Sequence, residues 1–554
     1  MKIGLVGAAA VAAVGLASPA AAKVDPNFVG CDGYDAPKKT ADGMNEIRGF
    51  LGGDVTSSAK AGGYALGDTG LKACDTALAD PRLLPEFWAR RAHIYQAKAL
   101  HQIAVGKFDE ALKQLDLSDK EGAGHNDPWF DDSIGLSNRL IRSVALYRLD
   151  RKDEARKTLE AAVASRPYAP SIAGLARSIE MLYEYDRKNF TRLLTDGVPL
   201  EPSLVRALFW TAIFHDDYAS AEKLMPQISF EIPKGHGSWR LVGESNYEYN
   251  LIRERAMLAG GLAYAKLALG KSAEARKLIA DARDDITDAI EPPQPAPDAK
   301  APTKSQLRDW EARKRYGDAA TRELDSWERS LDLRDKVKGK SFAEASTIVS
   351  ANGGAEPTIL TDVLRQVTPA NDAEREKIKT ILDKMEEGKD LGRRKSFALN
   401  LAQLVARLPR PETVAMRPKM QREGIGILRN DANGFAVKPD DATGLTTIRF
   451  GSTLAPRPMV EEAALLKAAQ VARAQGRDAF IITAAQSIQR TTTVYGYYGG
   501  GGSYDSGFES RLMIRPVDSS KLPPDLEAQR WRLVKADAVI AKLGPKYLVA
   551  DDAK

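Results

Sequence analysis

The sequence predicts a mainly α-helical protein, built as a degenerate array of helix hairpins, with a charged helical segment and a small C-terminal α+β domain after it. Three observations support this fold class. From Pro81 to Ile290 the chain consists of Ala- and Leu-rich segments of helical length, separated by short polar breaks. Residues 304–410 are highly charged but keep a helical pattern. Between 420 and 520, runs of β-branched and aromatic residues surround one amphipathic segment.

Length and composition limit the class of protein. A chain of 554 residues is long enough for about three domains. Its 28% charged and 43% hydrophobic residues are typical of a soluble globular protein. The 80 basic and 75 acidic residues nearly balance, and no long basic run occurs, so nucleic acid is not an expected partner. After the N-terminal segment, no apolar run is long enough for a transmembrane helix.

The N-terminal residues have the pattern of an export signal. Met1 and Lys2 give a positive start, residues 3–17 are apolar and uncharged, and residues 18–22 are small. We expect cleavage after Ala22 and a periplasmic or secreted protein. A short membrane anchor is the alternative, but a span needs about 20 strongly apolar residues. No cysteine directly follows the apolar run, so a lipoprotein acylation site is missing.

The two cysteines of the chain, Cys31 and Cys74, are expected to form a disulfide because the protein is expected to be exported. Two buried free thiols are the alternative. The cysteines belong to a Gly-rich N-terminal subdomain, 23–80, for which we expect loops and short helices.

Repeated helix starts occur in the region 81–290. Each combines a turn with an alanine on the helix that follows, and they are Gly106–Leu112, Asp150–Ala155, Asp216–Ala221 and Gly270–Ala275. The clearest unit has small and large apolar residues on two successive segments, closed by a proline: Ser143, Leu146, Ala155, Leu159, Ala162 and Pro167. Small residues at fixed places let paired helices approach closely.

This pattern resembles the tetratricopeptide repeat, which pairs a small residue and an aromatic or Leu on one helix with Ala on the next. The resemblance implies stacked helix hairpins that present a curved surface to a protein partner. The marker alanines are unequally spaced, and farther apart than the roughly 34 residues of an uninterrupted array. An unrelated all-helical bundle would share the same Ala and Leu periodicity.

Beyond the repeats, Glu291–Pro297 is too rich in proline for a helix, and 291–303 is expected to be an extended linker. Thr303–Lys340 is helical in pattern and contains Trp310 and Trp327; we expect a solvated helix or a projecting hairpin. Shorter helices should continue from Phe342 to Leu408.

In the α+β domain, Leu445–Phe450 and Ala479–Ile488 are expected strands, and Met459–Gln475 is an expected helix between them. Glu509–Arg515 alternates and should pair with the preceding strand. The stretches Glu462–Ala469 and Gln475–Ile482 resemble a small bacterial envelope domain found in uncharacterised lipoproteins, which also has a Gly/Tyr-rich insertion. That resemblance implies no chemistry. Residues 521–554 should form a C-terminal helix and tail.

Four tyrosines interleaved with glycines follow the second strand: Tyr495, Tyr497, Tyr498 and Tyr504. They are candidate partner-contact residues, because tyrosine offers a large contact area at a low entropic cost. A low-complexity hairpin loop without a role is the favoured alternative. The glycines do not form a phosphate-binding loop, since no Lys-Ser or Lys-Thr follows them.

No catalytic, cofactor-binding or metal-binding residues are predicted. The five histidines are scattered, and His93 and His101 lie too far apart on one helix to share a metal. The sequence contains no H-E-x-x-H motif, no G-x-S-x-G motif and no Cys/His dyad signature. We therefore expect an exported envelope protein that acts as a binding or assembly scaffold for a protein partner. An envelope enzyme of the cell-wall hydrolase type, with its site in the C-terminal α+β domain, is the alternative.

Overall fold

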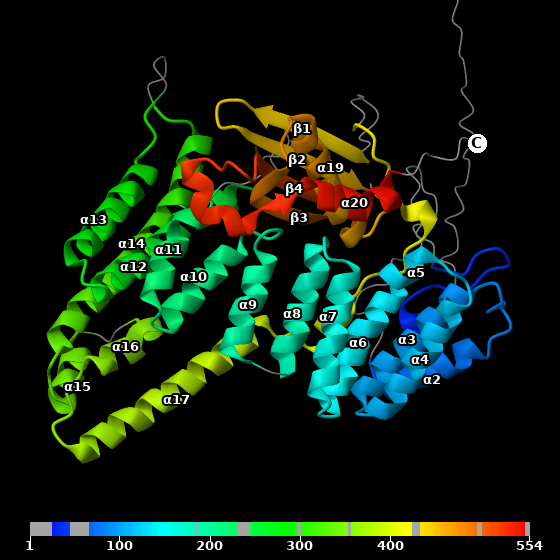
Figure 1. The fold of residues 1–554 in the computed structure, drawn as a ribbon, viewed down its shortest axis with the longest axis horizontal. Helices are drawn as coiled ribbons and strands as arrows, with labels where there is room; N and C mark the ends of the chain where they lie inside the picture. Colours follow the sequence, from blue (N-terminus) through cyan, green and yellow to red (C-terminus); the bar gives the residue numbers. More distant parts are fainter. Residues whose placement is uncertain are drawn as a thin grey trace, which may run out of the picture. The chain divides into compact units, whose positions relative to one another are not determined.

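The computed structural model describes residues 25–44, 66–183, 185–230, 244–295, 301–352, 356–423, 433–495 and 501–548. The expected export signal, 1–22, lies outside these ranges. The predicted fold class is confirmed: the chain is mainly α-helical and ends in an antiparallel five-stranded sheet with helices (Figure 1). The helices within the described ranges are too short or too polar to be candidate membrane spans. The chain forms two compact units, Met1–Asn126 and Asp127–Lys554.

The first unit is a small helical bundle joined by a disulfide. Its helices are α1 (Pro26–Asp32), α2 (Asp68–Leu78), α3 (Trp88–Ala104) and α4 (Phe108–Ala123). The predicted disulfide is confirmed, because Cys31 on α1 is bonded to Cys74 on α2. Both cysteines are buried in the core of the unit, beside Phe28 and Ile94.

His101 connects two segments of this unit through hydrogen bonds. Its Nδ1 accepts the N–H of Gly67 at 3.2 Å, so its Nε2 carries the hydrogen and donates to the carbonyl of Cys31 at 2.8 Å. Burial lowers the pKa of His101. Gly70 is needed next to this ring, since a Cβ there would lie 1.9 Å from Cε1 of His101.

The second unit begins with a series of helices that pack on their neighbours. In chain order these are α5 (Pro128–Asp132), α6 (Ile134–Arg148), α7 (Lys152–Ser165), α8 (Pro170–Tyr183), α9 (Arg187–Gly197), α10 (Leu204–Phe214), α11 (Tyr218–Leu224), α12 (Glu244–Ala268) and α13 (Ser272–Ala289). The four predicted helix starts are confirmed at α4, α7, α11 and α13. Their marker alanines are all fully buried: Ala111, Ala155, Ala221 and Ala275.

Ala155 offers a test of this helix pairing. It lies in α7, which packs on α6, whereas Lys157 on the same helix is exposed. Ala155→Ile should lower the free energy of unfolding by about 1 to 3 kcal/mol, because the added methyl groups overpack the contact. Lys157→Ile should change it by less than about 0.5 kcal/mol. Urea titrations would compare the two variants, and equal effects would contradict the pairing.

The charged segment after the prolines is not a solvated or projecting helix. It forms α14 (Lys304–Val337), which packs on α12 and α13 and buries Trp327 in the core that these helices share. A Cβ at Gly260 of α12 would lie 2.2 Å from Cγ of Trp327, so glycine permits this close approach. The solvated helix was predicted because this segment is highly charged. A helix needs only a few apolar residues per turn to bury one face, and the charged residues occupy the other faces.

After α14 the chain returns along the array. Its elements are α15 (Phe342–Ala351), α16 (Leu360–Arg365), α17 (Asp372–Phe397) and α18 (Leu401–Arg407). Side chains of α17 hold the ends of two earlier helices. Arg394 donates to the carbonyl of Leu182 at 2.6 Å, and Lys389 donates to the carbonyl of Phe214 at 2.6 Å. This return brings residues 408–416 back to the beginning of the second unit.

The C-terminal sheet has the strand order β1-β2-β4-β3-β5, and its paired strands are antiparallel. The strands are β1 (Gly434–Asp440), β2 (Leu445–Ser452), β3 (Ala479–Tyr495), β4 (Gly501–Val517) and β5 (Val534–Lys535). Helix α19 (Arg457–Ala474) covers one face, and α20 (Ala536–Tyr547) packs on α19. The expected strands, the helix between them and the pairing of β3 with β4 are confirmed. Strands β1 and β5 were not predicted from the sequence.

Candidate functional site: a buried charged cluster

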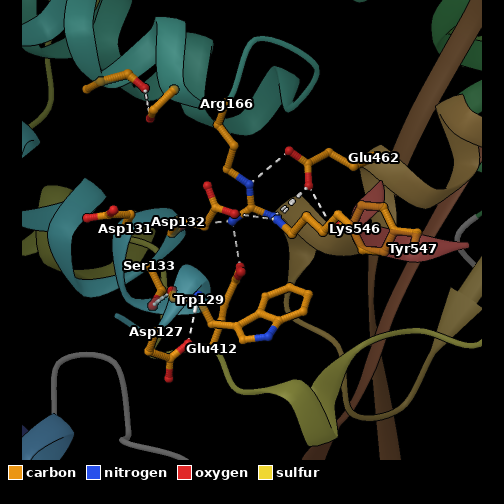
Figure 2. Close-up of polar contacts among 12 residues, drawn as sticks. Asp127, Trp129, Asp131, Asp132, Ser133, Arg166, Glu412, Glu462, Lys546 and Tyr547 are labelled. Atoms are coloured by element: carbon orange, nitrogen blue, oxygen red, sulfur yellow. Dashed lines mark hydrogen bonds and ion pairs between the residues drawn. The ribbon is translucent and has the colours of Figure 1, made fainter. Parts of the chain in front are cut away.

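A cluster of charged side chains lies between the helices of the second unit and the α+β domain. Figure 2 shows Arg166 at its centre. The Nη1 of Arg166 donates to Glu412 at 2.6 Å and to the carbonyl of Asp132 at 2.8 Å. Its Nε and Nη2 donate to the two carboxylate oxygens of Glu462 at 2.9 and 2.8 Å. The side chains of Arg166, Glu412 and Glu462 are only 1%, 0% and 2% exposed.

Two residues from the end of α20 complete the cluster (Figure 2). The hydroxyl of Tyr547 donates to Glu462 at 2.5 Å, and Nζ of Lys546 lies 3.3 Å from the same carboxylate. Lys546 also pairs with Asp132 at 2.8 Å, and its Nζ is 4.9 Å from the centre of the Trp129 ring. That geometry is a cation–π contact.

Local structure explains how distant segments supply these side chains. Arg166 is the first residue after α7, and Glu462 lies in the first half of α19. Glu412 follows α18 in the returning segment, whose Pro409 carbonyl accepts the hydroxyl of Ser137 at 3.1 Å. The cluster therefore connects the array, the returning segment and both helices of the α+β domain.

The charges of the cluster do not balance when every carboxylate is ionised. Arg166 and Lys546 supply two positive charges, against three carboxylates at Asp132, Glu412 and Glu462. Burial raises the pKa of Glu412 to about 7, despite the attraction of Arg166, and its Oε2 has no hydrogen-bond partner. Burial also acts on Glu462, but Arg166, Lys546 and Tyr547 outweigh it and lower the pKa of Glu462 to about 2.

These two pKa values predict how stability depends on pH. The ordinary pKa of a glutamate is 4.5, so native Glu412 holds a proton at pH values where the unfolded chain has lost it. Its contribution to stability is full below 4.5 and is lost as the pH rises through about 7. Glu462 acts in the opposite direction and only at lower pH, since its contribution is lost as the pH falls toward about 2.

Glu412→Gln should remove the first effect, because glutamine does not titrate. Urea titrations of both proteins at about pH 5 and about pH 8 would measure it. The wild type should lose on the order of 2 to 3 kcal/mol relative to the variant between these values. A difference between the proteins that is the same at both pH values would show that Glu412 titrates normally.

Two more contacts attach the α+β domain to the array. Glu461, next to Glu462 and also buried, accepts the backbone N–H of Ser171 at 3.1 Å and its hydroxyl at 2.6 Å. At a second place in the α+β domain, Arg532 donates to the carbonyl of Gln227, just after α11, at 3.2 Å and to the carbonyl of Ile482 in β3 at 2.8 Å. The α+β domain is thus held to the helices at separate places.

The arrangement can position elements, and its two glutamates are shut off from solvent. Glu412 and Glu462 are enclosed by protein, and general acid or base catalysis needs contact with the reacting group. Within the described ranges, no group of three or more His, Cys, Asp or Glu side chains is placed to hold a metal ion. The chemistry of this site is the pairing of buried charges.

The residues singled out from the sequence, two cysteines and four tyrosines, lie in separate parts of the chain. Cys31 and Cys74 form the disulfide of the first unit. Tyr495 and Tyr504 belong to the β3–β4 hairpin, but their side chains lie outside the description, as do Tyr497 and Tyr498 entirely. The buried cluster around Arg166 was not predicted from the sequence. One signal was available, since Glu461 and Glu462 interrupt an apolar helix that has few other charges.

Comparisons of the chain with protein-family models, with curated proteins and with solved structures each gave no match.

Proposed function

We propose that this chain is an exported protein of the bacterial envelope and acts as a binding or assembly scaffold. One observation carries the proposal: the buried cluster around Arg166 attaches the α+β domain to the helical array through fully enclosed ion pairs. A scaffold needs surfaces that keep a constant relative position, and sites on rigid elements are held more precisely than sites on loops.

Further observations favour the compartment and the mode of action. A disulfide between the two cysteines of the chain suits an oxidising compartment. The N-terminal pattern of residues 1–22 suits export. The hairpins with buried marker alanines are consistent with the tetratricopeptide-like interpretation, in which stacked helix pairs bind a protein segment.

In-cell photocrosslinking would test the proposal. A photoreactive residue would replace the exposed Lys157 of α7, and covalent partners would be identified from envelope fractions. We expect a small set of envelope proteins. A chain that lacks residues 1–22 is the control, because it should stay in the cytoplasm and capture none of them. Equal recovery with both chains, or no recovery with either, would contradict the scaffold proposal at this surface.

A further inference from the structure

A guanidinium without a counter-ion lies in the C-terminal half of α17. Within the part of the chain that the structure describes, the Arg393 side chain has no ion pair, and its Nε and Nη2 are enclosed without a hydrogen-bond partner. Its Cζ lies 4.3 Å from the centre of the Phe214 ring. Burial lowers the pKa of Arg393, and no carboxylate of the described residues opposes this effect. A buried cation without a partner destabilises a fold, and such groups are rare in native structures.

The unpaired atoms are the ones that hold carboxylates elsewhere in this protein. Nε and Nη2 form one edge of the planar guanidinium, and this edge can donate two parallel hydrogen bonds. Through it, Arg166 holds both carboxylate oxygens of Glu462 at 2.9 and 2.8 Å. Arg151 holds Glu154 in the same way, at 2.8 and 2.6 Å. The corresponding edge of Arg393 is therefore suited to a carboxylate or a phosphate group.

The polar groups beside Arg393 are also loosely paired. His215 follows α10, and its side chain is 2% exposed. Its Nε2 lies 3.4 Å from the hydroxyl of Tyr185 and 3.9 Å from Oδ1 of Asp390. Its Nδ1 lies 3.8 Å from Oε2 of Glu386. These separations are longer than good hydrogen bonds, and Oδ1 of Asp390 is itself enclosed without a hydrogen-bond partner.

The electrostatics of this region favour a hydrogen-bond donor next to the cation. Burial and Arg187 lower the pKa of His215 to about 4, although Glu386 opposes them. Arg393 acts on His215 in the same direction, but more weakly. Burial raises the pKa of Tyr185 to about 12, while Arg393 acts against that rise. At neutral pH His215 is therefore uncharged, and the hydroxyl of Tyr185 keeps its proton.

We propose that the Nε–Nη2 edge of Arg393 binds a small oxyanion, either a carboxylate or a phosphate group, with the Tyr185 hydroxyl as a second donor. The anion would supply the counter-charge that Arg393 lacks, and it would thereby stabilise the folded chain. The region reaches the surface, since Arg187 is exposed and the Asp390 side chain is 46% exposed. Binding requires the side chain of Arg393 to turn its enclosed edge toward the ligand. This inference goes beyond the proposed scaffold function and does not depend on it.

Thermal unfolding of the full mature chain would test the proposal, in sodium phosphate, sodium acetate and sodium chloride at neutral pH and equal ionic strength. Phosphate or acetate should raise the unfolding midpoint by about 2 °C or more relative to chloride, because the anion binds the folded state. A rise with acetate alone would identify a carboxylate ligand, and a rise with phosphate alone a phosphate ligand. No rise with either anion would overturn the site.

Arg393→Met tests the position, because methionine removes the guanidinium but keeps much of its volume. The variant should be more stable than the wild type in chloride and should lose the rise with the anion. Lys395→Met, at an exposed position of the same helix, is the matched control and should keep the rise. Equal rises in the wild type and Arg393→Met would show a general salt effect and overturn the site. Lower stability of Arg393→Met in chloride would also overturn it, since the guanidinium would then be satisfied without a ligand.

Arg393→Lys tests the two-bond geometry. Lysine keeps the charge but lacks the planar edge, so the affinity for the stabilising anion should fall by at least about tenfold in isothermal titration calorimetry. Unchanged affinity would show attraction by charge alone and would contradict binding through the Nε–Nη2 edge.

Discussion

Replacing Arg166 with methionine should lower the free energy of unfolding by about 3 to 5 kcal/mol. Methionine fills much of the volume of the side chain but removes the cation between Glu412 and Glu462. Glu462 would keep Lys546 and Tyr547, whereas Glu412 would lose its ion pair with Arg166. A buried carboxylate without a partner costs several kcal/mol, or takes up a proton. Urea denaturation at neutral pH would measure the loss.

Arg151→Met is the matched control. Arg151 also lies next to α7, but its pair with Glu154 is exposed, and such pairs contribute about 0 to 1 kcal/mol. If Arg166→Met does not fold, the stability of a triple variant that adds Glu412→Gln and Glu462→Gln provides a second test. It contains no uncompensated carboxylate at these positions and should be more stable than Arg166→Met alone. The proposal for the cluster fails if Arg166→Met and Arg151→Met are equally mild.

Replacing Cys31 and Cys74 together with alanine should lower the stability of the first unit by about 4 kcal/mol. The cysteines are 43 positions apart, and opening a loop of this length increases the conformational entropy of the unfolded chain. Hydrogen exchange followed by mass spectrometry would measure the effect on α1 and α2. The core helices of the second unit, such as α12, provide an internal control and should keep their protection. Unchanged exchange in α1 and α2 would contradict the prediction.

Sequence patterns predicted elements wherever local residues decide the structure. The four helix starts follow from a turn and an alanine on the next helix, and both are local features. Strands β2 and β3 were predictable from their β-branched and aromatic residues. Strand β1 was missed because Lys438, Pro439 and Asp440 interrupt its apolar pattern, and it is a strand because it pairs with β2. The residues of a strand do not specify which other strand it pairs with.

By itself, the sequence determined the fold class, the places where many helices begin, and the disulfide. The disulfide was the favoured expectation, over two buried free thiols, because one pair of cysteines occurs in a chain with the N-terminal pattern of an exported protein. Only the tertiary structure decided that Trp327 is buried and that Arg166, Glu412 and Glu462 meet. Glu412 and Glu462 lie 246 and 296 positions after Arg166, and the local sequence around each residue does not identify the partners that it meets. Long-range packing excludes water from these three side chains. A buried carboxylate is then either paired with an opposite charge or neutralised by a proton.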